Sequence, residues 1–320
     1  MEKTKHKKIS KRSVLFGVIF GVLVLYTALM FALLLLGLNT SLKNSKDLDL
    51  DGNIFGLPNM EWWAYDRNYP NNIFGNYLYA FKNLQATLTD SYIVGLFKQK
   101  KVSIYTEVGI MDATVNTLIY SIGGALVQTF VPMFVGYLCA KYKNKVSAII
   151  YTLVLIVIST PIIGNTAATI NFMRKLGLYD SFIGDFLRKA SFTNMYFLIF
   201  YAYFVGLSKS YDEAAELDGA SQFTVMVRIC FPLAMSLFGT IFLILFVANW
   251  NDFSNTMMFL PNKPTLSYLI YYRTTYLPIG FTEAPRKMAV LMLFAVPIII
   301  IFAIFNKKLM SNMTMGGVKE

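Results

Sequence analysis

Long uninterrupted apolar runs are the feature that most constrains this chain. A helix needs about 20 consecutive apolar residues to cross the hydrocarbon core of a bilayer. Six such stretches occur, namely Val14–Leu38, Ala113–Cys139, Val146–Ile163, Phe192–Leu207, Leu233–Phe253 and Met288–Phe305. Only helices and closed barrels satisfy the backbone inside lipid, and continuous rather than alternating runs disfavour a barrel. The sequence therefore predicts an all-α integral membrane protein with six transmembrane helices.

Composition and charge narrow the class further. Hydrophobic residues make up 56% and charged residues 15% of the 320 positions, which is too apolar for a soluble globule. The net charge of +11 would ordinarily suggest nucleic acid as a partner. The cations are dispersed over loops and chain ends instead of forming one stripe. We therefore expect anionic membrane lipid, and no nucleic acid, as the partner of this charge.

The basic residues also predict the orientation. A basic tail precedes the first apolar run, consisting of Lys3, Lys5, Lys7, Lys8, Lys11 and Arg12. The run is too long for a secretory signal and no small-residue cleavage site follows it. Together with Lys141–Lys145 after the second run, the tail predicts a multi-pass protein of the cell (plasma or inner) membrane with both termini in the cytoplasm. The expected outer loops are basic too, so the orientation depends mainly on these two segments.

No internal repeat or low-complexity linker divides the chain, which predicts one membrane domain. Its expected parts are a basic cytoplasmic tail (1–12), a first transmembrane helix (13–38), an extracytoplasmic insertion (39–111), a five-helix core (112–306) and a cytoplasmic C-terminal tail (307–320). Within the insertion, helical spacing of apolar residues predicts an amphipathic helix from Asn76 to Leu88. Trp62 and Trp63 are typical of an aromatic anchor near lipid headgroups.

A polar gap, Ser208–Pro232, separates the fourth and fifth runs and is expected in the cytoplasm. Ser210 followed by Glu213 fits a capping box that starts a short helix. Gly219 supplies a break, helical character resumes at Gln222, and Pro232 indicates where the next span begins. The gap therefore predicts a helix–turn–helix across the cytoplasmic mouth of the protein.

The spacing of residues within this gap is specific. Glu213-Ala214-Ala215 is followed after three residues by Gly219, after nine more by Ile229, and then by Phe231-Pro232. This pattern resembles the EAA loop of ABC importer permeases. Three further segments resemble the maltose-type (MalG-like) permeases, namely Asp218-Gly219-Ala220, Trp250-Asn251-Asp252 and Gly316-Gly317-Val318-Lys319. Phe231 departs from the Leu usual in the family, and the insertion is longer than the family minimum.

The resemblance covers most of the chain from Asn76 onward and implies a fold and a set of partners. The fold would be the type I (MetI-like) fold of ABC importers. The chain would be one of two homologous permease subunits in a prokaryotic membrane, working with two ABC ATPase subunits and an extracytoplasmic solute-binding protein. The cargo would be a sugar or oligosaccharide. ATP and Mg would be bound by the partner ATPase, with no cofactor in this chain.

The resemblance also assigns ATPase coupling to a set of residues, which are Glu213, Ala214, Ala215, Asp218, Gly219, Ile229 and Pro232. Such a loop must transmit the motion of an ATPase to helices in lipid. Ala214 and Ala215 let backbones approach closely, and Gly219 permits a sharp turn. Glu213 offers a carboxylate to a basic partner, or it merely caps its own helix. The glycines near the C-terminus either extend between the ATPase subunits or belong to a frayed end.

Catalysis by the chain itself is not expected. No Gly-Lys dipeptide occurs, so the phosphate-cradling Walker loop is absent. With His6 as the one histidine, a histidine-based metal site or catalytic triad is excluded. Cys139 and Cys230 are far apart and no disulfide is expected. We predict a transport subunit, not an enzyme, without a metal.

Polar residues close to the fifth span form a second candidate site, consisting of Asn249, Trp250, Asn251 and Asp252. A charged Asp at the bilayer centre costs about 2.5–3.5 kcal/mol, so these side chains should face protein or water. They either line the substrate pathway or its gate, or hold neighbouring helices together. The last outer loop is aromatic, and the resemblance implies contact with the binding protein for Tyr268, Tyr271, Tyr272 and Arg273. An interfacial aromatic belt is the alternative.

The sequence leaves two alternatives to sugar import. The EAA loop indicates that an ATPase drives the permease but does not identify the transported solute. A permease for glycerol phosphate or a peptide is therefore the runner-up. No cation is evident within the spans, which favours a neutral solute. A membrane enzyme or sensor would need a catalytic constellation or a cytoplasmic domain, whereas the largest cytoplasmic piece expected is Ser208–Pro232.

Overall fold

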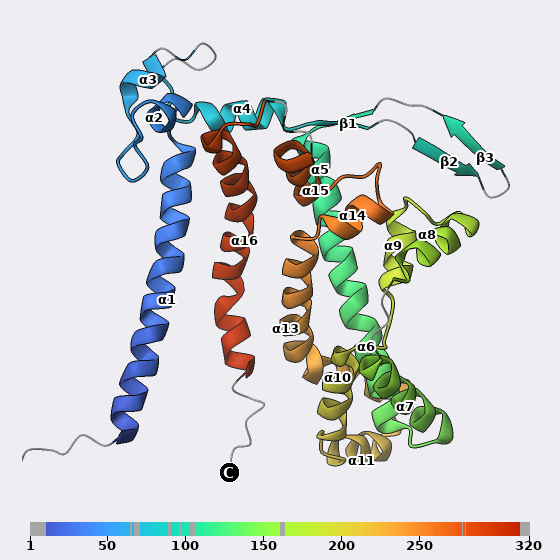
Figure 1. Ribbon diagram of the computed structural model, residues 1–320. Helices are drawn as coiled ribbons and strands as arrows, with labels where there is room; N and C mark the ends of the chain where they lie inside the picture. The colour runs from blue at the N-terminus through green and yellow to red at the C-terminus, as the bar shows by residue number, and fades with distance from the viewer. Residues whose placement is uncertain are drawn as a thin grey trace, which may run out of the picture. The chain divides into compact units, whose positions relative to one another are not determined.

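The computed structural model describes residues 11–64, 66, 71–88, 91–95, 98–102, 106–160, 164–276, 278 and 280–313 (Figure 1). The chain forms two compact units, one of residues 1–83 and 279–293 and the other of residues 84–278 and 294–320. The predictions for Lys3, Lys5, Lys7 and Lys8 and for the segment Gly316–Lys319 lie outside the described residues.

The first unit begins with α1 (Lys11–Ser41), the longest helix of this unit. Its residues from Leu15 to Leu35 are exposed, as expected of an apolar helix whose surroundings are lipid. Three short helices follow, α2 (Ser45–Asp49), α3 (Met60–Ala64) and α4 (Gly75–Asn83). The last helix of the chain, α16 (Ala284–Met313), gives its first residues to this unit and the remainder to the second.

Side-chain hydrogen bonds to backbone hold the short helices against the end of α1. The Asn76 amide donates to the carbonyl oxygens of Ser41 and Lys43 at 2.9 and 2.7 Å. Trp63 is 1% exposed and its indole N–H donates to the Leu42 carbonyl at 3.1 Å. Trp63 therefore belongs to the interior of this unit, which corrects its predicted place at the headgroups.

Two antiparallel strand pairs open the second unit, and the sequence did not predict them. β1 (Ala86–Leu88) pairs with β4 (Thr106–Val108), and β2 (Ser91–Gly95) pairs with β3 (Lys98–Val102). Because β1 starts at Ala86, α4 ends at Asn83 and the predicted helix to Leu88 is too long. Enrichment in β-branched and aromatic residues, as in Tyr92-Ile93-Val94, is the signal that indicates strands here.

The core of the second unit is helical. One continuous helix runs through α5 (Ile110–Leu118), the π-helical turn η1 (Ile119–Gly123) and α6 (Gly124–Lys141). α7 (Lys145–Ser159) follows, then the short α8 (Thr166–Lys175) and α9 (Phe182–Lys189), and then α10 (Met195–Val205). α6 and α10 pack closely at Gly136, where a Cβ would lie 3.1 Å from the backbone nitrogen of Tyr201.

The second half of this unit contains the predicted helix–turn–helix. α11 (Ser210–Leu217) precedes α12 (Gln222–Val225), the π-helical turn η2 (Met226–Cys230) and α13 (Phe231–Trp250). The last three form one continuous helix, Gln222–Trp250. The prediction that the span begins at Pro232 is therefore wrong, because the span continues the second helix of the loop. α14 (Ser254–Phe259), α15 (Leu266–Tyr271) and the π-helical turn η3 (Tyr272–Tyr276) follow.

The membrane-spanning character is carried by helices close to the six predicted runs. Among the described residues, four helices are long and apolar enough to cross a membrane, namely Leu15–Ser41, Ile110–Lys141, Gln222–Trp250 and Ala284–Ile301. α7 and α10 are apolar but shorter, and at a rise of about 1.5 Å per residue they are about 22 and 16 Å long. The fold is thus predominantly helical, and the described residues contain four long and two short apolar helices close to the six predicted runs.

Candidate functional site

The segment Ser210–Pro232, called the elbow below, has the sharp turn that the sequence predicts. Gly219 has φ +71°, a conformation that residues with a Cβ rarely adopt. The Ala220 N–H donates to the Ala215 carbonyl at 2.9 Å, which closes α11 with the Schellman pattern. A Cβ at Gly219 would meet nothing within 4 Å. Glycine is required here by backbone conformation and not by space.

The start of α11 differs from the predicted capping box. Ser210 is the first helical residue, and its own N–H donates to the Ser208 hydroxyl at 3.3 Å. The Glu213 N–H donates to the Lys209 carbonyl at 3.0 Å, so it is part of the first helical turn. The Glu213 side chain is exposed.

The second arm of the elbow is rigidly joined to a span. The Ser221 hydroxyl caps α12 by accepting from the Thr224 N–H at 3.2 Å. From Gln222 the helix continues through η2, which contains Ile229, into α13, where Pro232 is the second residue. No break therefore separates the second arm of the elbow from the span that ends at Trp250.

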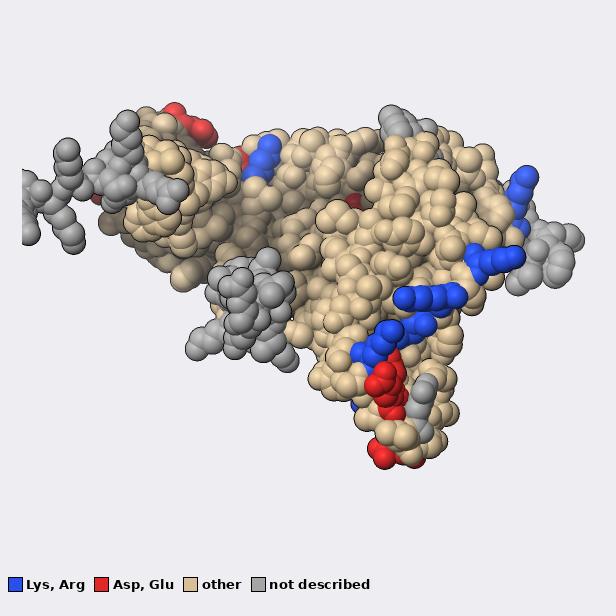
Figure 2. All heavy atoms as spheres, turned by 90° about the horizontal axis from the view of Figure 1, so that it is seen from below, with Lys and Arg blue, Asp and Glu red and all other residues tan. Residues whose placement is uncertain are grey.

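One face of the elbow is exposed and apolar. Leu217 is 90% exposed and Phe223 70% exposed, and Glu213 and Ala214 are exposed beside them. Ala215 is buried against the protein. Seen from below, acidic side chains gather with basic ones at this end of the second unit (Figure 2). Exposed apolar faces of this kind are typical of surfaces that contact another protein or a membrane.

Two sets of contacts fix the elbow to the helices behind it. The Lys141 ammonium at the end of α6 lies 2.5 Å from the Asp212 carboxylate on α11. Above the turn, Tyr137, Phe204 and Phe231 pack ring against ring with centroids 5.2 to 6.4 Å apart. Phe231, which stands where Leu is usual, thus joins α13 to α6 and α10.

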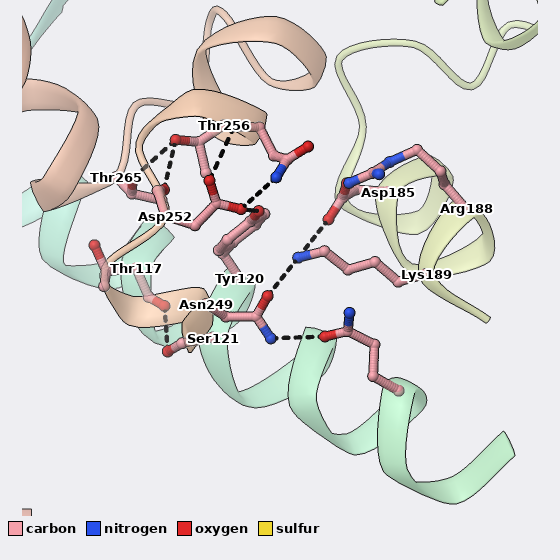
Figure 3. A network of polar contacts seen from close by, with 12 residues as sticks. Thr117, Tyr120, Ser121, Asp185, Arg188, Lys189, Asn249, Asp252, Thr256 and Thr265 are labelled. Atoms are coloured by element: carbon pink, nitrogen blue, oxygen red, sulfur yellow. Dashed lines mark hydrogen bonds and ion pairs between the residues drawn. The ribbon is translucent and has the colours of Figure 1, made fainter. Parts of the chain in front are cut away.

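A buried polar network forms the second site, at the other end of α13 (Figure 3). Its centre is Lys189 on α9, whose side chain is 5% exposed. The ammonium lies 3.1 Å from the Asp185 carboxylate, donates to the Asn249 side-chain oxygen at 3.0 Å, and lies 3.4 Å from the centre of the Tyr120 ring. Arg188 also pairs with Asp185, at 2.6 Å. A buried charge with this number of partners is held in one place.

Two glycines of the long helix Ile110–Lys141 make room for α9. A Cβ at Gly123 would lie 2.3 Å from the Phe186 ring, and one at Gly124 would lie 3.0 Å from the Lys189 nitrogen and 3.1 Å from the Asn249 amide nitrogen. Gly123 and Gly124 therefore form the notch that admits Phe186 and Lys189. Burial in this notch lowers the pKa of Lys189 to about 8, although Asp185 opposes the shift.

The network continues around Asp252. The Tyr120 hydroxyl donates to the Asp252 carboxylate at 2.7 Å, and the Asn255 amide donates to the same oxygen at 2.8 Å. The Asn249 amide donates to the Gln128 side-chain oxygen at 2.9 Å. The bond between Asn249 and Gln128 joins the helices Gln222–Trp250 and Ile110–Lys141, and the bond between Tyr120 and Asp252 joins the second of these to the segment after the first. Both bonds agree with the helix-binding alternative for Asn249 and Asp252.

The other residues predicted around the fifth span lie differently. Trp250 is 2% exposed and stacks on Phe294 at 5.9 Å between ring centres. Its indole nitrogen has no hydrogen-bond partner among the described residues. Asn251 is exposed, and its side chain donates to the Val247 carbonyl at 2.9 Å. The structure thus brings Asn249 and Asp252 into the network and leaves Trp250 and Asn251 beside it.

In the last outer loop, Tyr268 is 8% exposed. Tyr271 stacks on Phe253 with 4.4 Å between ring centres, and Tyr272 contacts Tyr276 at 5.5 Å. Tyr276, which was not among the predicted site residues, is 71% exposed. Arg273 is half-buried. Contact of this loop with a binding protein stays a prediction.

Sequence reasoning missed Lys189, Asp185, Tyr120 and Gln128. The i, i+4 spacing of Asp185 and Lys189 was visible but is common on solvated helices. The adjacent glycines Gly123-Gly124 within an apolar run were the better signal, because glycine pairs mark a close approach. Among the described residues, no group of three His, Cys, Asp or Glu side chains is placed to hold a metal ion.

Comparison with protein families gives one match. The model of the family described as "Binding-protein-dependent transport system inner membrane component" matches residues 132–314, more than half of the chain. The matched region includes the whole elbow and both Asn249 and Asp252.

Two curated relatives and one solved structure are similar to the chain. The arabinooligosaccharides transport system permease protein AraQ of Bacillus subtilis is 28% identical over 204 residues, which cover 64% of this chain and 72% of AraQ. The multiple sugar-binding transport system permease protein MsmG of Streptococcus mutans is 27% identical over 208 residues, 64% of this chain and 74% of MsmG. A chain of a bacterial ABC transporter involved in the import of the acidic polysaccharide alginate aligns over 94% of this chain and 99% of its own length, with a TM-score of 0.71 and 19% identity. That likeness shows the fold.

Proposed function

Because the chain belongs to the family of inner membrane components of binding-protein-dependent transport systems, we propose that it is a permease subunit that imports a sugar or oligosaccharide at the expense of ATP. As a member of this family it is a multi-pass membrane protein that works in a complex with other subunits. The proposal adds the energy source, the composition of the complex, the orientation and the cargo.

The observation that carries the proposal is the elbow. An exposed helix, α11, ends in a glycine turn and is followed by a helix that is continuous with a span. The exposed Leu217, Ala214 and Glu213 offer an apolar face with one carboxylate to a partner cleft. Such an element converts rigid-body movement of a partner into movement of a membrane helix. Glu213, Ala214, Ala215, Asp218, Gly219, Ile229 and Pro232 are the coupling residues of the proposal.

The complex would contain this chain, a second homologous permease, two ABC ATPase subunits and an extracytoplasmic solute-binding protein. ATP and Mg²⁺ would be bound by the ATPase subunits. The elbow and both chain termini would lie in the cytoplasm of a prokaryotic cell. The loop that holds Tyr268, Tyr271, Tyr272 and Arg273 would contact the binding protein, and we add the exposed Tyr276 to this set. ATP binding closes the ATPase pair and moves α11, the pathway opens outward, and hydrolysis returns it.

The cargo class rests on the relatives. AraQ and MsmG are named for arabinooligosaccharides and for multiple sugars, and a further relative, MalG of Thermococcus litoralis, is named for trehalose and maltose. Their names agree on carbohydrate and differ in the sugar. We therefore propose an oligosaccharide as cargo, in preference to glycerol phosphate or a peptide.

The test is purification of the tagged chain from its native membrane, followed by reconstitution of the complex into liposomes. We expect a second permease and an ABC ATPase to co-purify, and ATP-dependent uptake of at least one of arabinotriose, maltotriose and trehalose. Purification of the chain alone, or uptake without ATP, would contradict the ATP-driven importer. Uptake of glycerol 3-phosphate or a tripeptide but of no sugar would replace the cargo.

The orientation has its own test. A cysteine placed at Ser210 in the elbow should react with a membrane-impermeant maleimide in inside-out vesicles and not in intact spheroplasts. The matched control is a cysteine at the exposed Thr275 in the last outer loop, which should give the reverse result. Labelling of the elbow from outside would contradict the proposed coupling role.

A further inference from the structure

The side chain of Gln128 lies in an unusual place for a primary amide. It is 18 residues into the helix Ile110–Lys141, and at a rise of about 1.5 Å per residue it lies about 27 Å from one end and about 20 Å from the other. Gln128 therefore lies well inside a helix that is long and apolar enough to cross a membrane. Gln128 is nevertheless half-exposed on the surface of the chain. An amide at this depth faces water or protein, because lipid offers it no hydrogen bond.

A chain of hydrogen bonds fixes which end of that amide points outward. The Lys189 ammonium can only donate, so the Asn249 atom 3.0 Å from it must be the side-chain oxygen. The Asn249 nitrogen is then turned toward Gln128 and donates to the Gln128 oxygen at 2.9 Å. The Gln128 nitrogen is consequently the free end, and among the described residues no hydrogen bond engages it.

The start of this chain is firmly held. Lys189 is confined by the carboxylate of Asp185 and by the ring of Tyr120, and the Gly123–Gly124 notch leaves no room for displacement. Asp185 pairs with two cations, Lys189 and Arg188. Lys189, which can only donate, thus fixes the orientation of the Asn249 amide. The Asn249 amide in turn fixes the orientation of the Gln128 amide at the surface.

The geometry points to Gln128 as a cargo-contacting residue of the translocation pathway, which presents N–H donors to acceptor oxygens of the passing solute. Lys189 and Asn249 are its positioning residues. The inference rests on the proposed function and adds the side chain that meets the cargo and the polarity it presents. Sugar hydroxyls, ring oxygens and carboxylates are the acceptors that fit such a donor.

Water access is the first test and needs no knowledge of the cargo. Gln128→Cys is made in a chain with Cys139→Ser and Cys230→Ser, both native cysteines being buried, and the reconstituted complex is treated with a cationic, membrane-impermeant methanethiosulfonate reagent. We expect Gln128→Cys to react at least about tenfold faster than Leu126→Cys on the exposed apolar face of the same helix, since thiolate forms only where water enters. The inference would be overturned if Gln128→Cys and Leu126→Cys reacted at equal rates both without ATP and in the vanadate-trapped state.

The second test concerns the polarity of Gln128, because Asn249→Asp should reverse which end of the Gln128 amide points outward. The new carboxylate accepts from both Lys189 and Gln128, so the Gln128 amide turns and presents its oxygen outward. With maltotriose and an oligogalacturonate as probes, Asn249→Asp and Gln128→Glu should raise the KM for the acceptor-only carboxylates of the oligogalacturonate more than the KM for maltotriose. Lys189→Arg should retain the wild-type ratio of the two KM values, and Lys189→Met should lose it.

The outcomes separate this inference from the proposed function. Absence of ATP-dependent uptake of either probe by the wild-type complex would count against the proposed cargo, whatever Gln128 does. Uptake by the wild type with unchanged KM values in Gln128→Leu and Gln128→Glu would overturn the role of Gln128 and leave the importer intact. A fall in kcat alone, with the KM ratio unchanged, would likewise assign Gln128 a structural role.

Discussion

The two ends of the helix Gln222–Trp250 differ in whether their side chains are exposed or paired within the chain. At one end the elbow leaves an apolar helix face exposed and is attached by few polar contacts. At the other end, Asn249 and Asp252 lie in a network in which buried charges and amides are paired within the chain itself. The difference teaches that the elbow exposes side chains which a partner is able to cover, whereas most polar groups of the network are paired within the chain. A single rigid helix connects the two.

The largest effect should come from breaking the elbow at its turn. Gly219→Pro places a residue whose φ is fixed near about −65° where φ is +71°, and we expect roughly a hundredfold loss of ATP-dependent uptake. Gly219→Ala should lose less, because the left-handed conformation costs about 1–2 kcal/mol. Uptake and ATPase activity of the reconstituted complex are measured together.

The control is Gly206→Ala at the end of α10, where φ is −76° and a Cβ would make only ordinary contacts at 3.5 Å. We expect this variant to transport like the wild type. All three variants should reach the membrane with the ATPase bound. Normal coupled uptake in Gly219→Pro would remove the elbow from the mechanism.

The next largest effect should come from filling the notch of the network. In Gly124→Val a Cβ would lie 3.0 Å from the Lys189 nitrogen, and breaking a buried charged contact costs about 3–5 kcal/mol. We expect a clearly lower Tm of the complex in detergent. Gly239→Val is the matched control, because a Cβ there meets nothing within 4 Å. Equal Tm values for the two variants would mean that the network does not stabilise the fold.

The contrast between the ends also explains what the sequence predicts. A surface made for a partner keeps its signature in consecutive residues, so the spacing from Glu213 to Pro232 predicts the turn at Gly219 and the two arms. The network is assembled from η1, α6, α9, α13 and Asp252, and its bond between Tyr120 and Asp252 joins residues 132 positions apart. No local pattern reports such a contact. Six apolar runs predict the helices, but not that Gln222 and Phe231 belong to one helix, because a π-helical turn accommodates Pro232 without a break.

A smaller effect should come from titrating the network. Burial lowers the pKa of Lys189 from 10.5 to about 8, so between these values the unfolded chain binds the proton that the folded chain has released. The free energy of unfolding therefore rises with pH in this window, by at most about 1.4 kcal/mol per pH unit. Asp185 and Arg188 on α9, Tyr120 on η1 and Asp252 face the ammonium and are present in every variant compared.

The measurement is the Tm of the wild type minus that of Lys189→Met, between pH 8 and pH 10. We expect this difference to increase with pH, while discrimination between carboxylate and neutral cargo weakens as the ammonium loses its proton. The same substitution at the exposed Lys143 serves as control. A difference that stays flat or decreases would mean that burial of the charge does not dominate at Lys189.

The smallest effect should come from the contact that ties the elbow to α6. Lys141 and Asp212 are 16% and 27% exposed, and ion pairs of this kind contribute about 0.2–1 kcal/mol. Asp212→Asn should leave the Tm almost unchanged, because it removes little stability. It should still lower the uptake per ATP hydrolysed by about two- to fivefold. Without the ion pair, α11 more often moves with the ATPase while α6 stays in place, and the lost free energy sets how often this happens. The exchanged pair Lys141→Asp with Asp212→Lys should restore coupling, and Asp49→Asn, at an exposed aspartate in the other unit, should not affect it.

Because salt screens such a pair, raising the ionic strength should reduce coupling in the wild type and not in Asp212→Asn. If both respond to salt alike, the elbow is held by Ala215 and the aromatic contacts of Phe231, and the two ends of the helix differ less than their charges indicate.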